Sequence, residues 1–294
     1  KTSIGAQELS KKGVSNAAAA VTKTAGVSKG AKNVVVRGLG DRYNSTTLNG
    51  LPLPSEDPEY KNISLSFFDT SIIQSVGINK VFSSDINGDV GGANIDIVSK
   101  DLRKKRVANL GVSFSGNSQT LTKKDFQTID GTNRLGIQKL NHEVTDLNTY
   151  SFDNSFKPKT QNFQLNNSFS FNYGKKYSVG EEGTLSYFVV GGFNGAYNFT
   201  EGNVRQTTND GVAEPFRDLG FSQYTYNTSQ LIMGNLKYKS GKGLDLAFNH
   251  LFIHNNKQSI GDYYGKDDPQ EEGDLVFLRR QQTNNNELYV NQLL

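Results

Sequence analysis

Cysteine is absent from this chain of 294 residues, so the protein can hold no disulfide framework and no thiolate metal site. Long apolar runs are absent too, and no stretch approaches the roughly 20 residues of a membrane-spanning helix. The first residues lack the pattern of a signal peptide. Three interpretations stay open: a soluble chain, a processed chain, or a β-barrel, whose strands carry no such run.

Apolar residues are scarce in the composition. Hydrophobic residues make up 35% of the chain, whereas about 45–50% is usual on a count that includes glycine. Glycine, phenylalanine and tyrosine are plentiful, at 30, 18 and 13 residues. Because disordered chains contain few aromatics, this composition indicates exposed β-structure. The net charge of +3 is too small to predict a nucleic-acid partner, and we expect none.

The residues up to about Lys100 predict a small α+β domain. Gln7 to Lys12 forms a candidate helix that Gly13 would end. A second helix is expected from Ala17 to Thr24, capped by Ser15 or Asn16 and ended by Gly26. Three strands are expected in the same region, over residues 34–36, 72–80 and 93–99.

A basic run, Arg103 to Arg106, marks the predicted boundary between a first domain over residues 1–102 and a second part over residues 103–294. This run could contact phosphate or anionic headgroups, but we favour a solvated hinge between two domains. After it, apolar and polar residues alternate strictly, which is typical of a half-buried strand. The apolar face of this first strand holds Ala108, Leu110, Val112 and Phe114.

Five further strands are expected, over residues 163–173, 185–199, 226–238, 244–252 and 287–294. Their connections alternate between long ones (119–160, 201–225, 262–274) and short ones (175–183, 240–243), as in outer-membrane barrels. The runs reach the about 9–11 residues that a tilted transmembrane strand needs, with Tyr226 and Tyr238 as candidate interface aromatics. The alternative is a soluble antiparallel sandwich with long loops, although sandwich strands are usually shorter.

Two glycine-rich or acidic motifs mimic ligand sites. Gly38-Leu39-Gly40 begins like a dinucleotide fingerprint, but Tyr43 stands where the third glycine belongs. Asp85 to Asp89 resembles the start of a calcium loop, but Val90 occupies the glycine position and Asp96 replaces the usual glutamate. We therefore expect a sharp turn at the first motif and no calcium at the second.

No other pattern predicts chemistry. His142, His250 and His254 are too scattered for a metal site, although the last two could share one face of a strand. The acidic segment 267–272 is more typical of a solvated loop than of a cation site. No Ser/His/Asp arrangement emerges from the spacing. We expect no catalytic residue, no metal and no cofactor, and the protein is not expected to be an enzyme.

Three segments, in order, resemble the plug domain of TonB-dependent outer-membrane receptors. The first is Val36-Arg37-Gly38 followed by residues 47–53, and the second is residues 72–80. The third and most specific is Gly88 to Lys100, which is similar to the Gly-Gly-x-Ile-x-Ile-x-Thr-Lys segment that closes such plugs. One departure is Val81-Phe82 after Lys80, where the family often has Gly-Pro, which leaves that turn undefined.

The resemblance covers about residues 5–100 by motif and implies a mainly β fold. A small α+β plug over residues 1–102 would be followed, over residues 103–294, by the first six or so antiparallel strands of a transmembrane β-barrel of about 22 strands. Six strands cannot close around a plug, and the sequence ends in mid-strand at Leu293-Leu294. We therefore expect the front piece of a longer receptor, whose TonB-binding box lies outside this sequence.

The family resemblance also implies the function: a receptor in the outer membrane of a Gram-negative bacterium, with the plug inside the barrel. It would bind an unknown extracellular ligand and import it when TonB, with its inner-membrane energising complex, pulls the plug. Outer-membrane lipid is an expected partner, and a surface lipoprotein is a further candidate partner. The ligand-binding candidates, at a plug apex, are Gly38, Gly40, Asp41, Arg42 and Tyr43. Arg37 is the candidate latch between plug and barrel.

Two alternatives to an importer remain open. One is a receptor-like structural subunit of a larger outer-membrane complex. The other is a soluble β-rich binding or adhesion module, which would fold alone from this segment without detergent.

Overall fold

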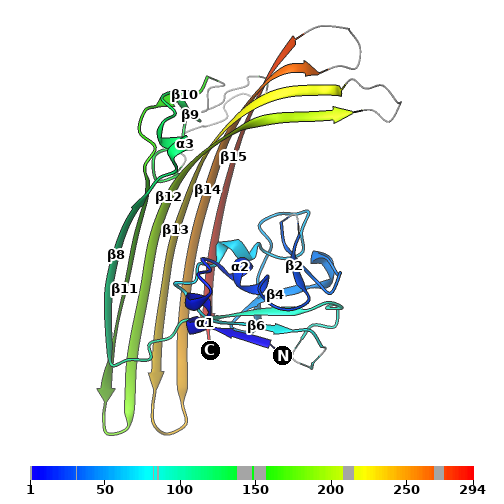
Figure 1. Ribbon diagram of the computed structural model, residues 1–294. Helices are drawn as coiled ribbons and strands as arrows, with labels where there is room; N and C mark the ends of the chain where they lie inside the picture. The colour runs from blue at the N-terminus through cyan, green and yellow to red at the C-terminus, as the bar shows by residue number, and fades with distance from the viewer. Residues whose placement is uncertain are drawn as a thin grey trace.

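A computed structural model describes residues 2–30, 32–81, 83–84, 86–137, 148, 157–207, 215–267 and 275–294. Figure 1 shows two parts, a compact amino-terminal part from β1 (Thr2–Gly5) to β7 (Asn94–Ser99), which we call the amino-terminal domain, and a sheet of six long strands. The domain lies against one face of the sheet, near the lower ends of the strands as drawn. Within these residues, no helix combines the length and the apolar character that crossing a membrane requires.

Two short helices of the amino-terminal domain were predicted from their stop and cap residues. Helix α1 (Ala6–Lys11) ends before Gly13, whose φ of 61° suits a residue without Cβ. Helix α2 (Ala17–Val21) begins at Asn16, whose side chain accepts a hydrogen bond from the Ala19 amide at 2.9 Å. The predicted extension of α2 to Thr24 is wrong, because the Lys23 and Thr24 amides donate three residues back and tighten the last turn.

A five-stranded sheet forms the centre of the amino-terminal domain, in the order β1-β6-β7-β4-β5. β4 and β7 are parallel, and the other neighbours are antiparallel. The predicted strands at 72–80 and 93–99 are present with slightly shorter bounds. The strands are β1 (Thr2–Gly5), β4 (Ser45–Leu48), β5 (Leu51–Pro52), β6 (Ile73–Asn79) and β7 (Asn94–Ser99).

The remaining elements of the domain connect these strands. A two-stranded hairpin of β2 (Val27–Lys29) and β3 (Val34–Val36) lies beside the sheet, and β3 confirms the predicted strand at residues 34–36. Two single 3₁₀ turns follow, η1 (Asp41–Tyr43) and η2 (Leu65–Phe67).

The large sheet confirms six antiparallel strands, each paired with its neighbour along the chain. Its order is β15-β14-β13-β12-β11-β8. The strands are β8 (Arg106–Ser115), β11 (Asn166–Val179), β12 (Gly183–Thr207), β13 (Pro215–Lys239), β14 (Asp245–Asp267) and β15 (Leu275–Leu293).

Two of the predicted long loops are partly strand. β12 and β13 each run for 25 residues and leave only 208–214 between them, where a loop over 201–225 was predicted. Likewise β14 and β15 leave 268–274 in place of 262–274. The prediction was wrong because the alternation that marks a strand is weak there: residues 201–207 are mostly polar, and the apolar residues of β13 shift from odd positions (Leu219, Phe221) to even ones (Tyr224, Tyr226).

The inner face of the six-stranded sheet, defined as the face that contacts the amino-terminal domain, contributes to one apolar core shared with that domain. Even positions of β12 and odd positions of β13 and β14 point to this side. The sheet residues in the core are Phe188, Val190, Leu231, Met233, Leu251, Ile253 and Leu288. Most of the domain's apolar interior, including Ile73, Val76 and Ile97, belongs to the same core, so domain and sheet are held together by packing.

The outer face is the opposite side of the same strands and carries an apolar band. Leu110, Val112 and Phe114 are 72%, 60% and 66% exposed. The predicted half-buried strand is therefore wrong as a statement about protein packing, since no described protein element covers this face of β8. The band also includes Phe169, Phe171, Leu185, Val189, Phe193, Ile232, Leu236, Leu246, Phe248, Tyr289 and Leu293.

A folded loop covers the outer face near the other ends of the strands. It connects β8 to β11 and contains α3 (Ser118–Leu121), β9 (Phe126–Thr128) and β10 (Lys159–Gln161). Phe126 is fully buried and meets the rings of Tyr197 and Tyr224 edge-on, with centroids 5.5 and 5.4 Å away. We call this segment the outer-face loop. It makes a second core, which also holds Ile129, Phe199, Tyr226 and Ile260.

Asn44 is the polar residue that we expect to contribute most to the stability of the amino-terminal domain. It is 3% exposed; its Nδ2 donates to the Gly40 carbonyl at 3.0 Å, and its Oδ1 accepts from the Ala93 amide at 3.0 Å. We predict that Asn44→Ala destabilises the domain by about 2–3 kcal/mol, since it orphans buried backbone groups. Native-state hydrogen exchange of residues 39–46 in the full-length protein measures this. Asn87→Ala, at an exposed asparagine, is the control, and equal protection in both variants would contradict the prediction.

Candidate functional site

The predicted apex begins with a tight hairpin turn at Arg37 and Gly38. Val36 and Leu39 exchange two backbone hydrogen bonds, at 3.0 and 2.9 Å. The φ angles of Arg37 and Gly38 are 51° and 81°, which define a type I′ turn. Gly38 therefore has a conformational reason to be glycine. Gly40 does not, because its φ of −78° is open to any residue.

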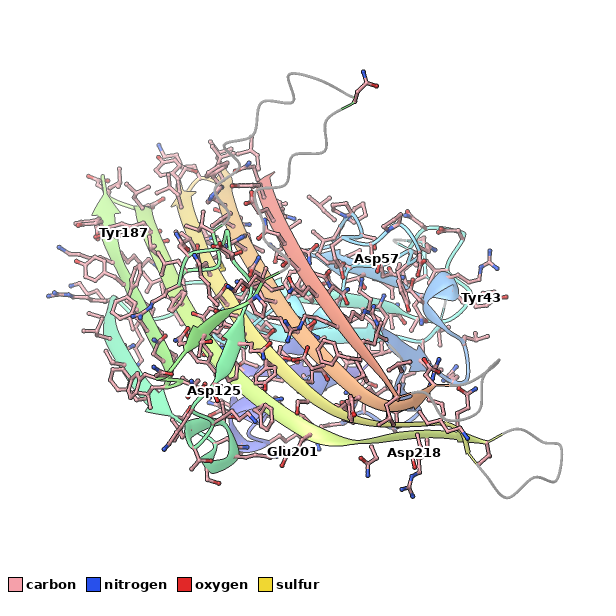
Figure 2. The ribbon with its side chains drawn as sticks, turned by 90° about the horizontal axis from the view of Figure 1, so that it is seen from above. Tyr43, Asp57, Asp125, Tyr187, Glu201 and Asp218 are labelled. Atoms are coloured by element: carbon pink, nitrogen blue, oxygen red, sulfur yellow. The ribbon has the colours of Figure 1, made fainter. Side chains whose placement is uncertain are left out.

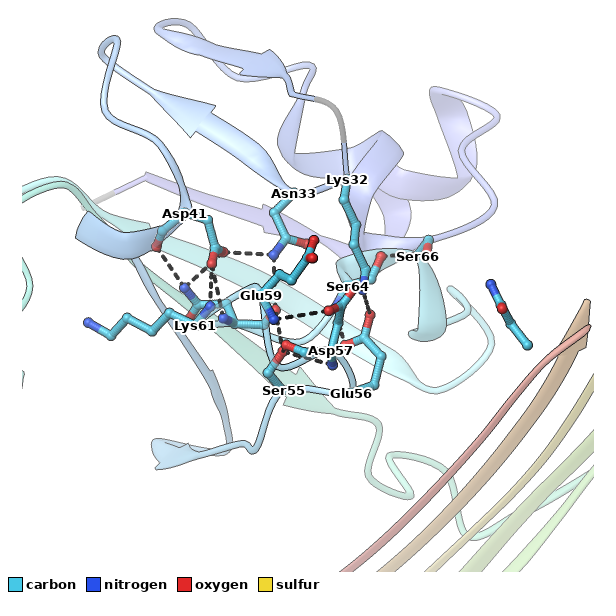
Figure 3. A network of polar contacts seen from close by, with 12 residues as sticks. Lys32, Asn33, Asp41, Ser55, Glu56, Asp57, Glu59, Lys61, Ser64 and Ser66 are labelled. Atoms are coloured by element: carbon cyan, nitrogen blue, oxygen red, sulfur yellow. Dashed lines mark hydrogen bonds and ion pairs between the residues drawn. The ribbon is translucent and has the colours of Figure 1, made fainter. Parts of the chain in front are cut away.

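Asp41 opens the 3₁₀ turn that follows the hairpin and acts as a brace within the domain. One carboxylate oxygen accepts hydrogen bonds from the amides of Lys61 and Asn62 at 2.6 and 3.2 Å. The other accepts from the side-chain amides of Asn33 and Asn62 at 2.7 and 3.0 Å. Figure 3 shows this network tying three chain segments together. With four donors on two oxygens, Asp41 positions its neighbours and has little capacity left for a ligand.

Arg42 and Tyr43 differ from Asp41 because their side chains are exposed. The Tyr43 carbonyl accepts from the Gly92 amide at 2.8 Å, and its ring lies close to Gly91. Figure 2 shows Tyr43 on the side of the domain that faces away from the six-stranded sheet. Of the predicted apex residues, these two present a free cation and a free aromatic ring.

Arg37, the predicted latch, makes its described contacts inside the domain. Its guanidinium donates to the Lys80 carbonyl at 3.3 Å, and its backbone amide donates to the Gly26 carbonyl at 2.8 Å. The Lys80 ammonium in turn donates to the Ala25 carbonyl. A latch between Arg37 and barrel carboxylates stays a prediction.

A second polar cluster joins Lys32 to the loop at residues 55–64. The Lys32 ammonium lies 2.9 Å from Glu56 and 2.7 Å from Asp57. Burial would lower the pKa of Lys32, but its hydrogen bonds to these carboxylates outweigh burial and raise it. The hydrogen bond from Lys32, and then that from the Glu59 amide, lower the pKa of Asp57. The pair therefore stays charged over the whole neutral range and holds the loop that Asp41 also braces.

The contact that the sequence did not reveal is an amide clasp between the domain and β15. Gln292, 5% exposed, donates to the Leu48 carbonyl at 2.8 Å and accepts from the Asn49 side chain at 2.8 Å. Asn49 and Gly50 form a type I′ turn between β4 and β5, with φ of 52° and 80°. Asn49 also accepts from the Ser99 amide at 2.9 Å, so one turn connects β15 to β7.

A polar cleft separates the domain from the other side of the inner face. Its volume is about 510 Å³. Ser168, Ser170 and Asn194 line it from the sheet, and Asn16, Asp69 and Ser71 line it from the domain. A nearby ion pair, Lys237 with Asp101 at 3.3 Å, connects the end of the domain to β13. The inner face therefore has an apolar contact with the domain on one side and, on the other, a gap in which these polar groups are joined by apolar residues such as Phe67 and Leu231.

A family model for the TonB-dependent Receptor Plug Domain matches residues 1–93. The amino-terminal domain is a TonB-dependent receptor plug. This confirms the resemblance drawn from the three sequence segments. Strand β7 begins at Asn94, just beyond the match, and pairs with β4 and β6 of the plug. The boundary at residue 102 stays a prediction.

A comparison with solved structures returned outer-membrane receptors at low sequence identity. The siderophore receptor PirA of Acinetobacter baumannii matches 98% of this chain with 11% identity and a TM-score of 0.41. A variant of the ferric enterobactin receptor PfeA of Pseudomonas aeruginosa matches 90% with 9% identity and a TM-score of 0.36. The alcaligin outer-membrane receptor FauA of Bordetella pertussis matches 99% with 10% identity and a TM-score of 0.36.

The chain spans about half the length of these solved proteins, at 44%, 49% and 58% of PirA, PfeA and FauA. A comparison with curated proteins returned no match.

The motifs set aside in the sequence have structural roles where they are described. Asp96 accepts hydrogen bonds from the Thr47 hydroxyl and the Gly50 amide, both at distances below 3 Å. His250 and His254 share the outer face of β14, and each bonds to an asparagine of β15. Across the described part of the chain, no group of three His, Asp or Glu side chains could hold a metal. Asp85, His142 and nearly all of the acidic segment 267–272 lie outside the described residues.

Replacing Asp41 by alanine tests whether it braces the plug or binds ligand. We predict a loss of about 2–3 kcal/mol in local stability at residues 57–64, because two backbone amides lose their acceptor. Hydrogen exchange of the full-length protein measures this loss. Arg42→Ala is the control and should change stability by less than about 0.5 kcal/mol, as an exposed residue does. Unchanged exchange in the Asp41 variant would show that the brace is not needed.

Replacing Gln292 by leucine tests the amide clasp. The Leu48 carbonyl and the side-chain amide of Asn49 would lose their hydrogen-bond partner at the buried Gln292 position, which would lower the stability by about 1–3 kcal/mol. We expect faster exchange of residues 45–52 and easier separation of plug from sheet in urea. Gln282→Leu on the same strand is the matched control, since the described hydrogen bonds of Gln282 stay within β15. Equal behaviour of the two variants would rule the clasp out as an anchor.

Proposed function

We propose that this protein is a TonB-dependent receptor of the Gram-negative outer membrane, which imports a ligand through a plugged barrel with energy transmitted by TonB. The observation that carries the proposal is the combination of a plug domain on the inner face with a bilayer-wide apolar band on the outer face. A soluble sandwich would bury both of its apolar faces, whereas among the described residues the part of the outer face below the outer-face loop has no protein partner.

The dimensions of the outer face support placement in a bilayer. On β12, the band runs from Leu185 to Phe193, about nine residues, which is near the 9–11 that a tilted transmembrane strand needs. The next outer residues, Tyr197 and Phe199, are buried under the outer-face loop. Toward the β11–β12 turn, Tyr173, Tyr177 and Tyr187 are interspersed with the last apolar residues of the band, Leu185 among them, as interface aromatics would be. A contiguous exposed apolar surface of this size is unusual on a soluble monomer.

The proposed mechanism uses the two kinds of contact on the inner face. The plug closes the lumen by apolar packing on β12–β15 and by the clasp at Gln292. The polar cleft beside it, lined by Ser168, Ser170 and Asn194, is suited to a hydrated solute. Moving the plug would expose the apolar surface that it shares with the sheet, and energy transmitted by TonB is proposed to offset the free energy lost in that step.

In the proposed binding site, the predicted apex residues divide into two roles. Arg42 and Tyr43 contact the ligand, offering a cation and a ring with a hydroxyl. Gly38, Gly40 and Asp41 hold the backbone that presents them. Arg37 is the proposed latch to a barrel carboxylate, which breaks when the plug moves.

The test uses the full-length protein in its own bacterium. We expect recovery in outer-membrane fractions, heat-modifiable migration on gels, and uptake of a labelled ligand that is lost without TonB. The ligand is found by screening ferric siderophores, cobalamin, glycans and peptides. Arg42→Ala with Tyr43→Ala should weaken binding about tenfold or more without changing the migration of the protein.

Each alternative predicts a different result. If the protein were found in the cytosol, or if this segment folded in water without detergent, the receptor proposal would be wrong and a soluble module would be favoured. Stable co-purification with a larger outer-membrane assembly, together with no TonB-dependent uptake across the screen, would show a structural subunit instead.

A further inference from the structure

A cluster of two cations and three tyrosines ends the apolar band beside the short β11–β12 turn. The basic run of the sequence contributes only Arg106 to this cluster, and β11 contributes Lys175, a residue that the sequence did not single out. Both side chains lie on the outer face, because Arg106 shares its parity with Leu110 and Lys175 shares its parity with Phe171. Figure 2 shows Tyr187 on the side of the sheet opposite to the plug.

The geometry sets the two cations directly against each other. Arg106 and Lys175 are cross-strand partners, and like charges in that position destabilise a sheet. Each cation lies near a ring, Arg106 with its guanidinium carbon 6.0 Å from the centroid of Tyr173 and Lys175 with its ammonium 4.5 Å from that of Tyr177. In the described residues, no carboxylate forms an ion pair with either of them.

The tyrosines complete the wall of the cluster. The ring of Tyr187 lies 5.8 Å from that of Tyr173 and 6.2 Å from that of Tyr177, measured between centroids. Their hydroxyl groups are hydrogen-bond donors of the kind that phosphate oxygens accept. The cluster therefore offers two positive charges and several donors, and it lacks an anion.

We propose that Arg106, Lys175 and these three tyrosines bind the phosphate headgroup of an anionic phospholipid in the periplasmic leaflet of the outer membrane. The site rests on the proposed function, since it needs the band in a bilayer. A lipid is favoured over free phosphate because the apolar residues Phe171 and Val189 follow the cluster on the side away from the turn and can receive acyl chains. Of the basic run, only Arg106 belongs to β8 and to the proposed lipid site, whereas Arg103 to Lys105 precede β8.

Native mass spectrometry of the full-length, detergent-extracted protein tests the proposal. Dioleoylphosphatidylglycerol is the probe, and dioleoylglycerol, which lacks the phosphate, is the uncharged comparison. We expect the phosphatidylglycerol to bind and the diacylglycerol to bind far less. Arg106→Gln with Lys175→Gln should weaken phosphatidylglycerol binding about thirtyfold, and Lys175→Gln alone about fivefold, since each basic residue near a membrane surface contributes comparably.

Lys176→Gln is the matched control, because it removes the same charge from the neighbouring position, on the inner face of β11. It should leave the affinity unchanged. Equal losses in the Lys175 and Lys176 variants, or no loss in either the single or the double variant, would overturn the site. Displacement of the lipid by inorganic phosphate at equal concentration would overturn the lipid assignment. Absence of the full-length protein from the outer membrane would defeat the proposed function instead, which is a separate result from unchanged lipid binding.

Discussion

Alternation of side chains along six long antiparallel strands is the constraint on which the rest of this structure depends. Each strand has two faces with different surroundings, and a shift of one residue in register would exchange them. The outer face is apolar from Leu110 on β8 to Leu293 on β15, while the inner face carries serines and asparagines where it borders the polar cleft. The four central strands are paired with a neighbour on both sides, while β15 and β8 form the two edges of the sheet.

The plug packs against only part of the inner face of the sheet. Its apolar core is continuous with Val190, Met233 and Ile253, so part of the plug is packed against the sheet as if both belonged to one domain. On the β8 and β11 side, the contact is replaced by the cleft near Ser170. The sheet therefore packs against the plug on one flank and leaves a cleft of about 510 Å³ on the other.

The sequence predicted much of this fold because the signals were local. Gly13 and Asn16 marked helix ends, and the strict alternation around Leu110 and Phe171 marked strands. Beyond the apolar band the same reasoning failed, since the end of β12 around Glu201 and Asn203 is exposed and mostly polar and so has no apolar alternation. The clasp between Asn49 and Gln292 joins residues 243 positions apart and has no local signal. The sharp turn before Asp41 was predicted, but the donors that bind its carboxylate come from residues 33, 61 and 62, which spacing does not bring together.

The strand order of the plug gives a direction to any mechanical load. β1 is one edge of the five-stranded sheet, and the clasped turn of β4 and β5 is at the other. A force that enters at the amino terminus meets β1 first, which is held to β6 by only four residue pairs. It reaches the anchored edge only after passing through β6 and β7. The strands of the plug would therefore bear such a force one after another. The β1–β6 pairing, which bears it first, is short, whereas the β4–β5 turn is held to β15 by two hydrogen bonds of Gln292.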